Sequence, residues 1–309
     1  MRQCFIISLP RAGSTLLQRL LATHPEIQTV GEPWVALPFA YALRVGGVVA
    51  EYNHHLLCEA LGEFIAQIPG GKRTYFAETA RFIQSLQQKI ALPGKTWFVD
   101  KTPRYHLILD ELAEMFPDAK FIVLYRNPLA VVASILNTWK EGRFSMRYFD
   151  QDIFRGPRNI LQFVEKRAVQ IHTVRFEDLA VAPDQVMKRV TDFLEVTPLA
   201  TTDLPEDDAL KRARFGDKTG IEKFKSVSAT PVSEWTKSYA SPLRRAWARK
   251  YLRQIGPDNL RKMGYDAVEL RQAMKSLPWS WTQLWADIRT LHIHALEVFA
   301  HSPYFPAKV

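Results

Sequence analysis

Cysteine is scarce in this sequence, which has 2 cysteines among 309 residues. Cys4 falls in an expected strand and Cys58 in an expected helix, and two cysteines give neither a disulfide framework nor a metal cluster. Met1 stands a few residues before the first expected strand, which leaves no room for a signal peptide. No apolar run approaches the ~20 residues that a membrane span needs. We therefore expect a cytoplasmic protein.

Acidic residues are outnumbered, since 41 Lys and Arg face 32 Asp and Glu and give a net charge of +9. This charge favours anionic partners. The basic residues are dispersed, and aromatic residues do not interleave with them as in RNA-binding patterns. We therefore expect a small anionic cosubstrate and no nucleic acid. A hydrophobic content of 47% and a charged content of 24% indicate a globular protein.

The turn that follows the first apolar run, residues 4–9, lacks two residues of a common phosphate-binding motif. Residues 10–15 contain one glycine and two hydroxyls before an apolar-periodic helix, which places backbone N–H groups and a helix N-terminus together. The turn lacks the second glycine and the lysine of a Walker A motif, and its cation, Arg11, precedes Gly13. The pattern predicts an anion site, with a basic strand-to-helix turn capped by Ser or Thr as the alternative.

Strands and helices alternate along the first two thirds of the chain, which predicts an α/β fold with a central parallel sheet flanked by helices. Polar turns follow three expected strands, at the edge of the sheet where ligands bind. In sequence order, the strands are expected at residues 4–9, 96–99, 120–125 and 170–176, and the polar turns at 10–15, 100–103 and 126–128. Asn127 and Pro128 are expected as the N-cap and first residue of a helix.

The expected domain organisation is one α/β domain over residues 1–265 and a helical extension over 266–309. Residues 35–95 are expected to be a helical insertion that shapes the acceptor site, and residues 105–115 another helix. In the extension, apolar residues such as Trp281, Trp285 and Ile288 recur at helical spacing after a capping box of Ser280 and Gln283. This helix is expected to pack on its own core or on a partner in a homodimer, with peripheral membrane contact as the less favoured alternative.

With these segments in hand, the chain resembles the PAPS-dependent sulfotransferases, in particular the bacterial branch similar to tyrosylprotein sulfotransferases. Residues 10–16 are similar to the 5′-phosphosulfate loop, written P-R-S-G-T/S-T-L, with Ala12 in place of its serine. Residues 116–134 are similar to the 3′-phosphate motif and residues 176–179 to the Y-E-D-L turn. Residues 100–103 resemble the segment with the catalytic lysine. The resemblance implies a P-loop-like, three-layer fold.

The resemblance also implies the site residues. Catalytic roles fall to Arg11, Glu32 and Lys101, and binding of adenosine 3′-phosphate 5′-phosphosulfate (PAPS) to Arg11, Ala12, Gly13, Ser14, Thr15, Leu16, Arg126, Ser134, Phe176, Lys218 and Lys225. Arg126 and Ser134 would hold the 3′-phosphate, and Phe176 would lie near the adenine. No metal is expected.

Several residues could act as the base that takes the proton of the acceptor. In the cytosolic branch a histidine two residues after the lysine takes the acceptor proton, but Pro103 occupies that position here. Glu32 matches the glutamate of the tyrosylprotein-like branch, with a structural turn carboxylate as the alternative. Lys101 alone would be a surface lysine, and His24 is expected to be a packed residue. His54, His55 and His106 remain further candidates for the base.

The implied function is transfer of a sulfuryl group from PAPS to a hydroxyl or amine by in-line displacement, with release of adenosine 3′,5′-bisphosphate (PAP). The acceptor is left open among small molecules, sugars, lipids and peptide hydroxyls. Two alternatives remain: a P-loop-type small-molecule kinase, and a non-catalytic protein that binds nucleotides or nucleic acid. The missing lysine after Gly13 and the lack of a convincing Mg²⁺-binding carboxylate argue against the kinase.

Overall fold

A computed structural model describes the chain except for residues 147–148, 167–168, 200–203, 205–229, 277 and 301–309, and except for the side chains of 291–300. The chain divides into two compact units, each described here by itself. Unit 1 comprises Met1–Tyr125 and Gly156–Ser228, and unit 2 comprises Arg126–Arg155 and Ala229–Val309. The division predicted at residue 265 and the role predicted for residues 35–95 stay predictions.

Unit 1 is built on a five-stranded sheet in the order β2-β3-β1-β4-β5. The strands are β1 (Arg2–Ser8), β2 (Ile27–Thr29), β3 (Trp97–Asp100), β4 (Lys120–Tyr125) and β5 (Gln170–Arg175). Every neighbouring pair is parallel, with Phe5 of β1 opposite Asp100 of β3 and Ser8 opposite Leu124 of β4. The predicted parallel sheet is confirmed. The sequence did not predict β2, because an edge strand of three residues is too short to show periodicity.

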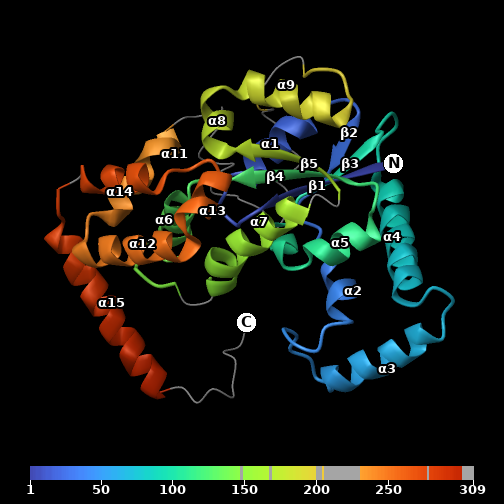
Figure 1. Cartoon of the computed structure of the whole chain (residues 1–309), viewed down its shortest axis with the longest axis horizontal. Coiled ribbons are helices and arrows are strands. Elements are labelled where there is room, and N and C mark those ends of the chain that lie inside the picture. The colour runs from blue at the N-terminus through green and yellow to red at the C-terminus, as the bar shows by residue number, and fades with distance from the viewer. Residues whose placement is uncertain (147–148, 167–168, 200–203, 205–229, 277, 301–309) are drawn as a thin grey trace. The chain divides into compact units, whose positions relative to one another are not determined.

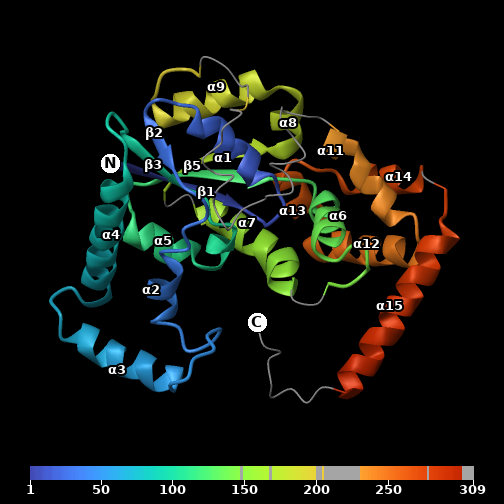
Figure 2. The same cartoon turned by 180° about the vertical axis from the view of Figure 1, so that it is seen from behind.

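The central strands form the core of unit 1, since β3 and β4 are buried along their whole length. Such continuous burial explains their unbroken apolar runs, because helices cover both faces of a parallel sheet. Figures 1 and 2 show α1, α8 and α9 on one face and α5 and α7 on the other. The helices of these two layers are α1 (Ser14–Ala22), α5 (Leu109–Met115), α7 (Gly156–Lys166), α8 (Phe176–Val181) and α9 (Pro183–Leu194). The predicted three-layer arrangement is confirmed.

The segment between β2 and β3 is helical, as its composition predicts. It contains α2 (Leu37–Tyr41), α3 (His54–Ala66) and α4 (Gly71–Ile90). The side chain of Asn53 caps α3 by accepting hydrogen bonds from two backbone N–H groups of its first turn. The helix predicted for residues 105–115 is wrong in its first half, where the chain forms a 3₁₀ turn, η1 (Pro103–Leu107). Ile108, with an extended φ of −131°, separates this turn from α5.

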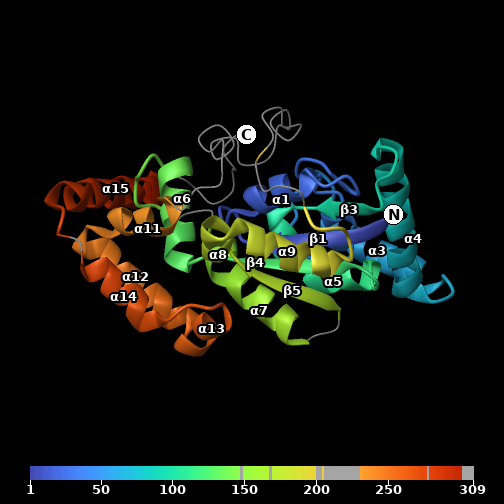
Figure 3. The same cartoon turned by 90° about the horizontal axis from the view of Figure 1, so that it is seen from above.

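Unit 2 is helical in the residues that the structure describes (Figure 3). Its elements are α6 (Pro128–Trp139), η2 (Gln151–Arg155), α11 (Thr230–Ser233), η4 (Glu234–Tyr239), α12 (Pro242–Ile255), α13 (Pro257–Lys262), α14 (Ala267–Lys275) and α15 (Trp281–Ala300). Helix α6 begins as predicted, because Pro128 is its first residue and the Asn127 side chain accepts from the Leu129 N–H at 2.9 Å.

The start of α15 forms half of the predicted capping box. The Ser280 hydroxyl accepts from the backbone N–H of Gln283 at 3.2 Å. The Gln283 side chain instead accepts from the backbone N–H of Ser241 at 2.7 Å. It therefore ties α15 to the start of α12 rather than closing the box.

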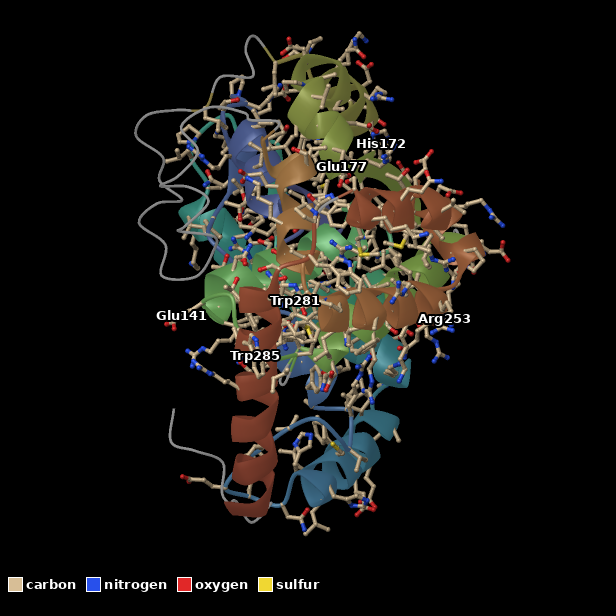
Figure 4. The ribbon with its side chains drawn as sticks, turned by 90° about the vertical axis from the view of Figure 1, so that its left-hand side faces the viewer. Glu141, His172, Glu177, Arg253, Trp281 and Trp285 are labelled. Atoms are coloured by element: carbon tan, nitrogen blue, oxygen red, sulfur yellow. The ribbon has the colours of Figure 1, made fainter. Side chains whose placement is uncertain are left out.

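The face of α15 that packs on unit 2 is polar. Asp287 is fully buried and Thr290 nearly so, whereas Trp281, Trp285 and Ile288 are 62%, 63% and 41% exposed. Figure 4 labels Trp281 and Trp285 on α15. The prediction that these three apolar residues pack on the chain's own core is therefore wrong. The buried ion pair between Asp287 and Arg244 instead places the Asp287 face of α15 inside unit 2. Contact of the exposed face with a second copy or a membrane stays a prediction. Among the described residues, no helix combines the length and hydropathy of a membrane span.

Candidate active site

Gly13 determines the shape of the loop after β1. It is the N-cap of α1, with a φ of +94° that L side chains rarely adopt. A Cβ atom at this position would lie 2.3 Å from Cδ2 of Phe176, whose ring is 5% exposed and packs on the glycine. Only glycine therefore allows both the turn and this close approach. Helix α1 begins at Ser14, two residues before the predicted apolar stretch.

Backbone donors gather at the start of α1. Among the described residues, no side chain caps this helix, whose first turn includes Ser14 and Thr15. The N–H groups of Leu16 and Leu17 both point to the Gly13 carbonyl, at 3.0 and 3.5 Å. Ala12 is buried, and its N–H donates to the Leu9 carbonyl at 3.2 Å. An uncapped helix N-terminus of this kind attracts anions.

Arg11 has a φ of 67°, which is uncommon for a residue with a side chain. Backbone conformations of this kind concentrate at functional sites, where the surrounding structure holds them. Arg11 is partly exposed and belongs to the turn that leads into α1. The structure thus brings together the predicted residues 11–16, and their chemistry suits a phosphate or sulfate group.

Lys101 and Glu32 form an ion pair across 69 residues of sequence. The Lys101 Nζ lies 2.7 Å from Oε1 of Glu32, and the two side chains are 1% and 13% exposed. Lys101 directly follows β3, the neighbour of β1 in the sheet, so the pair lies at the sheet edge that carries the Gly13 loop. Two residues predicted separately are therefore in contact. Lys101 is not the surface lysine that it would be in isolation.

Glu32 is held in place from both sides of the segment that follows β2. On one side, the Gln18 side chain of α1 donates to the Thr29 hydroxyl and to the Val30 carbonyl, both at 2.7 Å. On the other side, the Trp34 indole N–H lies 3.3 Å from Oε2 of Glu32. Glu32 is therefore more than a capping carboxylate, because its two oxygens face a buried ammonium and an indole N–H.

Asp100, the last residue of β3, was missed by the sequence analysis. Its carboxylate is 1% exposed and accepts hydrogen bonds from the hydroxyls of Thr102 at 3.0 Å and Tyr105 at 2.9 Å. Burial raises the pKa of Asp100 to about 7, although the two hydroxyls and the Lys101 charge act in the opposite direction. The sequence offered one signal, a cluster of polar residues directly after a buried strand.

The predicted 3′-phosphate residues belong to unit 2. Arg126 directly follows β4 and is partly exposed between the buried residues Tyr125 and Asn127. Ser134 is likewise partly exposed, whereas every other residue of 128–136 in α6 is buried. Both residues are thus partly exposed between buried neighbours. Lys218 and Lys225, also predicted to bind the cosubstrate, lie outside the described residues.

The four histidines considered above are buried or have structural partners. His24 is 1% exposed and its Nε2 lies 2.8 Å from the Thr197 carbonyl, which confirms the prediction of a packed residue. The Nε2 of His54 lies 2.8 Å from the Arg44 carbonyl. His55 pairs with Glu59 on the exposed side of α3. His106 is buried in η1. These contacts leave Glu32 as the better candidate for a base.

Comparisons with known proteins identify the family of this chain. The model of the sulfotransferase family matches residues 3–200, so the chain belongs to this family. The nodulation protein NoeE of Sinorhizobium fredii is 30% identical over 292 residues, which cover 85% of this chain and 66% of NoeE. Protein-tyrosine sulfotransferase A of Caenorhabditis elegans is 26% identical over 211 residues, which cover 62% of this chain and 49% of that protein. The chain thus spans less than two thirds of the length of these relatives.

Solved structures agree in fold. The sulfotransferase domain of the Synechococcus PCC 7002 olefin synthase superposes with a TM-score of 0.57 at 24% identity, covering 86% of this chain and 95% of that domain. The sulfotransferase domain of the curacin biosynthetic pathway superposes with a TM-score of 0.53 at 25% identity, covering 76% of this chain and 90% of that domain. Family membership favours sulfuryl transfer over the kinase and nucleic-acid-binding alternatives.

Proposed function

We propose that this chain transfers a sulfuryl group from PAPS to a hydroxyl or amine acceptor and releases PAP. The observation that carries this proposal is the buried Lys101–Glu32 pair at the sheet edge of the Gly13 loop. It supplies a fixed cation and a carboxylate beside a set of anion-binding backbone donors. Sulfuryl transfer, like phosphoryl transfer, depends mostly on such positioning and electrostatics.

The residues of the loop suit the phosphosulfate end of PAPS. When bound, PAPS supplies an activated sulfuryl group. The N–H groups at the start of α1 and the Arg11 guanidinium would bind the 5′-phosphate oxygens, because aligned amides and a planar fork of donors both match such oxygens. The ring of Phe176 supports the loop through its contact with Gly13.

Glu32 is proposed to accept the proton of the acceptor group. A base must lie within hydrogen-bond reach of the proton that it takes, and Glu32 is the more accessible member of its pair. Lys101 orients the carboxylate through Oε1 and keeps a positive charge at the site where negative charge develops. The pair thus combines base and electrostatic stabilisation in one buried contact.

Arg126 and Ser134 are proposed to bind the 3′-phosphate, and Lys218 and Lys225 to contribute to cosubstrate binding. An arginine binds phosphate with two parallel N–H···O bonds, and a serine hydroxyl adds a third donor. The support is the accessibility of Arg126 and Ser134 among buried neighbours. The acceptor class is open among small molecules, sugars, lipids and peptides, with peptide tyrosine included because two relatives are named for it.

Thermal unfolding with PAP and with AMP tests the nucleotide site. PAP at about 100 times its Kd should stabilise the protein by about 2.7 kcal/mol, and AMP by far less because it lacks the 3′-phosphate. Arg126→Ala should remove the preference for PAP. Arg143→Ala, which removes an exposed arginine paired with Glu141, is the matched control and should keep it. Equal shifts from PAP and AMP in the wild type would contradict the 3′-phosphate assignment.

Transfer of radiolabelled sulfate from PAPS tests the activity itself. The panel of acceptors should contain a phenol, a hexose, a glycolipid and a tyrosine peptide, each compared with a methylated analogue that lacks the free hydroxyl. We expect labelled product from at least one hydroxyl compound and none from its analogue. PAP binding without transfer to any member, or hydrolysis of PAPS alone, would count against the proposed activity.

A further inference from the structure

Asp100 lies at the centre of a buried hydrogen-bond network next to Lys101. Its Oδ1 accepts from the Thr102 hydroxyl at 3.0 Å, and its Oδ2 accepts from the Tyr105 hydroxyl at 2.9 Å. Both of these residues are themselves buried, at 0% exposure. Above about pH 7, where this carboxyl is ionised, it can only accept hydrogen bonds, so both hydroxyl protons then point toward Asp100.

The same two hydroxyls hold the segment that carries Glu32. The backbone N–H of Trp34 donates to the Thr102 hydroxyl, and the N–H of Ala36 donates to the Tyr105 hydroxyl, each at 3.3 Å. A hydroxyl has one proton and two lone pairs, so donation to Asp100 leaves the lone pairs free to accept from the backbone. The carboxylate therefore sets the direction of two hydrogen bonds that end at residues two and four positions after Glu32.

We propose that Asp100, Thr102 and Tyr105 are positioning residues that hold the Glu32 segment against Lys101. This inference rests on the proposed function of the Lys101–Glu32 pair. The end of β3 presents Lys101 and, through the network, fixes the segment that carries its partner. One strand end thus positions both members of the pair.

The segment that carries Glu32 has a second attachment, to α1. Gln18 of α1 holds Thr29 and Val30 through hydrogen bonds that do not involve Asp100. Thr29 in turn donates to the Val99 carbonyl at 2.7 Å. Loss of one hydroxyl of the network should therefore loosen residues 32–36 locally, while β2 stays paired to β3.

Amide hydrogen exchange measures the two donors directly. Thr102→Val keeps the shape of the side chain but removes the hydroxyl, and Thr102→Ser keeps the hydroxyl. We expect the Trp34 amide to exchange at least about tenfold faster in Thr102→Val, which corresponds to the loss of about 1.4 kcal/mol of protection. Thr102→Ser should restore most of the protection. Tyr105→Phe should accelerate exchange at Ala36 in the same way.

Two results of the exchange experiment would overturn the proposal. Unchanged exchange at Trp34 and Ala36 would show that the hydroxyls do not hold the segment. Equal acceleration in β1 and β4 would show that the substitution destabilises the whole unit instead. This measurement needs neither PAPS nor an acceptor, so it stands even if the chain transfers no sulfuryl group and the proposed function fails.

Kinetics test whether the network acts through Glu32. Thr102→Val should lower kcat about tenfold with KM for PAPS nearly unchanged, and Thr102→Ser should recover most of the kcat. In a Glu32→Gln background, Thr102→Val should cause no further loss, because the group that it positions is already inactive. An equal loss of kcat in both backgrounds would show that Thr102 does not act through Glu32.

Discussion

Each compact unit contains a buried ion pair with short contacts, and the two pairs differ in what surrounds them. In unit 1, Lys101 and Glu32 lie 2.7 Å apart with exposures of 1% and 13%. In unit 2, Arg244 and Asp287 lie 2.6 Å apart with exposures of 3% and 0%. Distance and burial alone do not distinguish a site from a structural contact.

The second pair is surrounded by protein hydrogen-bond partners. The Arg244 Nε donates to both oxygens of Asp287, and its terminal nitrogens donate to the carbonyls of Ser238 and Gly142. This pair ties α15 to α12, to η4 and to the turn at Gly142, which is a structural role. Glu32, by contrast, is partly exposed at the end of a parallel sheet. Position and access, rather than strength of pairing, mark the candidate site.

Glu32→Gln should give the largest effect and should act on turnover. Loss of the base is expected to lower kcat by about 10²- to 10⁴-fold. Binding of PAP should change little, because the glutamine oxygen can still accept from Lys101. The free energy of unfolding should also fall, because a neutral glutamine leaves the buried Lys101 charge without compensation. Single-turnover transfer of radiolabelled sulfate measures the first quantity, and urea denaturation measures the second.

Glu111→Gln is the matched control for that experiment. Glu111 is also an ion-paired glutamate of unit 1, bound to Arg44 and 15% exposed, but it lies on α5. The kcat of the Glu111→Gln variant should stay near the wild-type value. Normal turnover in Glu32→Gln, or an equal loss in both variants, would remove the functional distinction between the two pairs.

Asp287→Asn should act on stability instead of turnover. Removing one partner from a buried pair costs about 3 kcal/mol because the other charge is left without compensation. Urea denaturation should show this loss, whereas kcat per folded molecule should be unchanged. The double substitution Arg244→Met with Asp287→Leu should recover most of the stability, since apolar side chains can replace a buried pair. If the double variant is as unstable as Asp287→Asn, the pair contributes more than compensation of charge.

The pH dependence of stability should give the smallest change per step of the experiment, one pH unit, and it comes from Asp100 of the unit 1 site. Burial raises the pKa of this carboxyl from 3.8 to about 7. Between these values the folded protein holds the proton more tightly than the unfolded chain does. The contribution of Asp100 to the free energy of unfolding should therefore fall as the pH rises from about 4 to about 7, by at most about 1.4 kcal/mol per pH unit, and level off above.

Urea denaturation between about pH 5 and pH 8 measures this slope, and Asp100→Asn should remove it. Asp110→Asn, which changes an exposed aspartate paired with Lys166, is the control and should keep it. Identical slopes in the wild type and in Asp100→Asn would mean that this carboxyl titrates at an ordinary pH. A raised carboxyl pKa would then no longer distinguish the Lys101–Glu32 site of unit 1 from the Arg244–Asp287 pair of unit 2.

Much of the fold could be predicted from local patterns. The apolar runs of β1, β3 and β4 and the turns after them are contiguous in sequence, so the parallel sheet and the Gly13 loop follow from them. Asn127 and Pro128 predicted the start of α6 for the same reason. The edge strand β2 and the 3₁₀ turn η1 were missed because a few residues show too little periodicity to be recognised.

The exposed side of α15 shows how such reasoning fails. Apolar spacing predicts that Trp281 and Trp285 face a core, because burial of apolar area normally decides how a helix is oriented. Here the buried ion pair of Asp287 and the hydrogen bond of Gln283 to Ser241 orient the helix. Arg244 lies 43 residues from Asp287 in sequence, and Ser241 lies 42 residues from Gln283. No local pattern predicts contacts over such separations.

The sequence by itself determined the parallel α/β sheet, the glycine at the phosphate-type loop and the presence of Lys101 after a buried strand, because each depends on neighbouring residues. Only the tertiary structure decided that Lys101 meets Glu32 and that Asp100 organises two hydroxyls around the segment of Glu32. Hydrogen bonds and ion pairs need atoms within about 3 Å, and the folding of the sheet brings them together. Sequence patterns encode which faces are buried, whereas the partners of buried polar groups depend on the assembled fold.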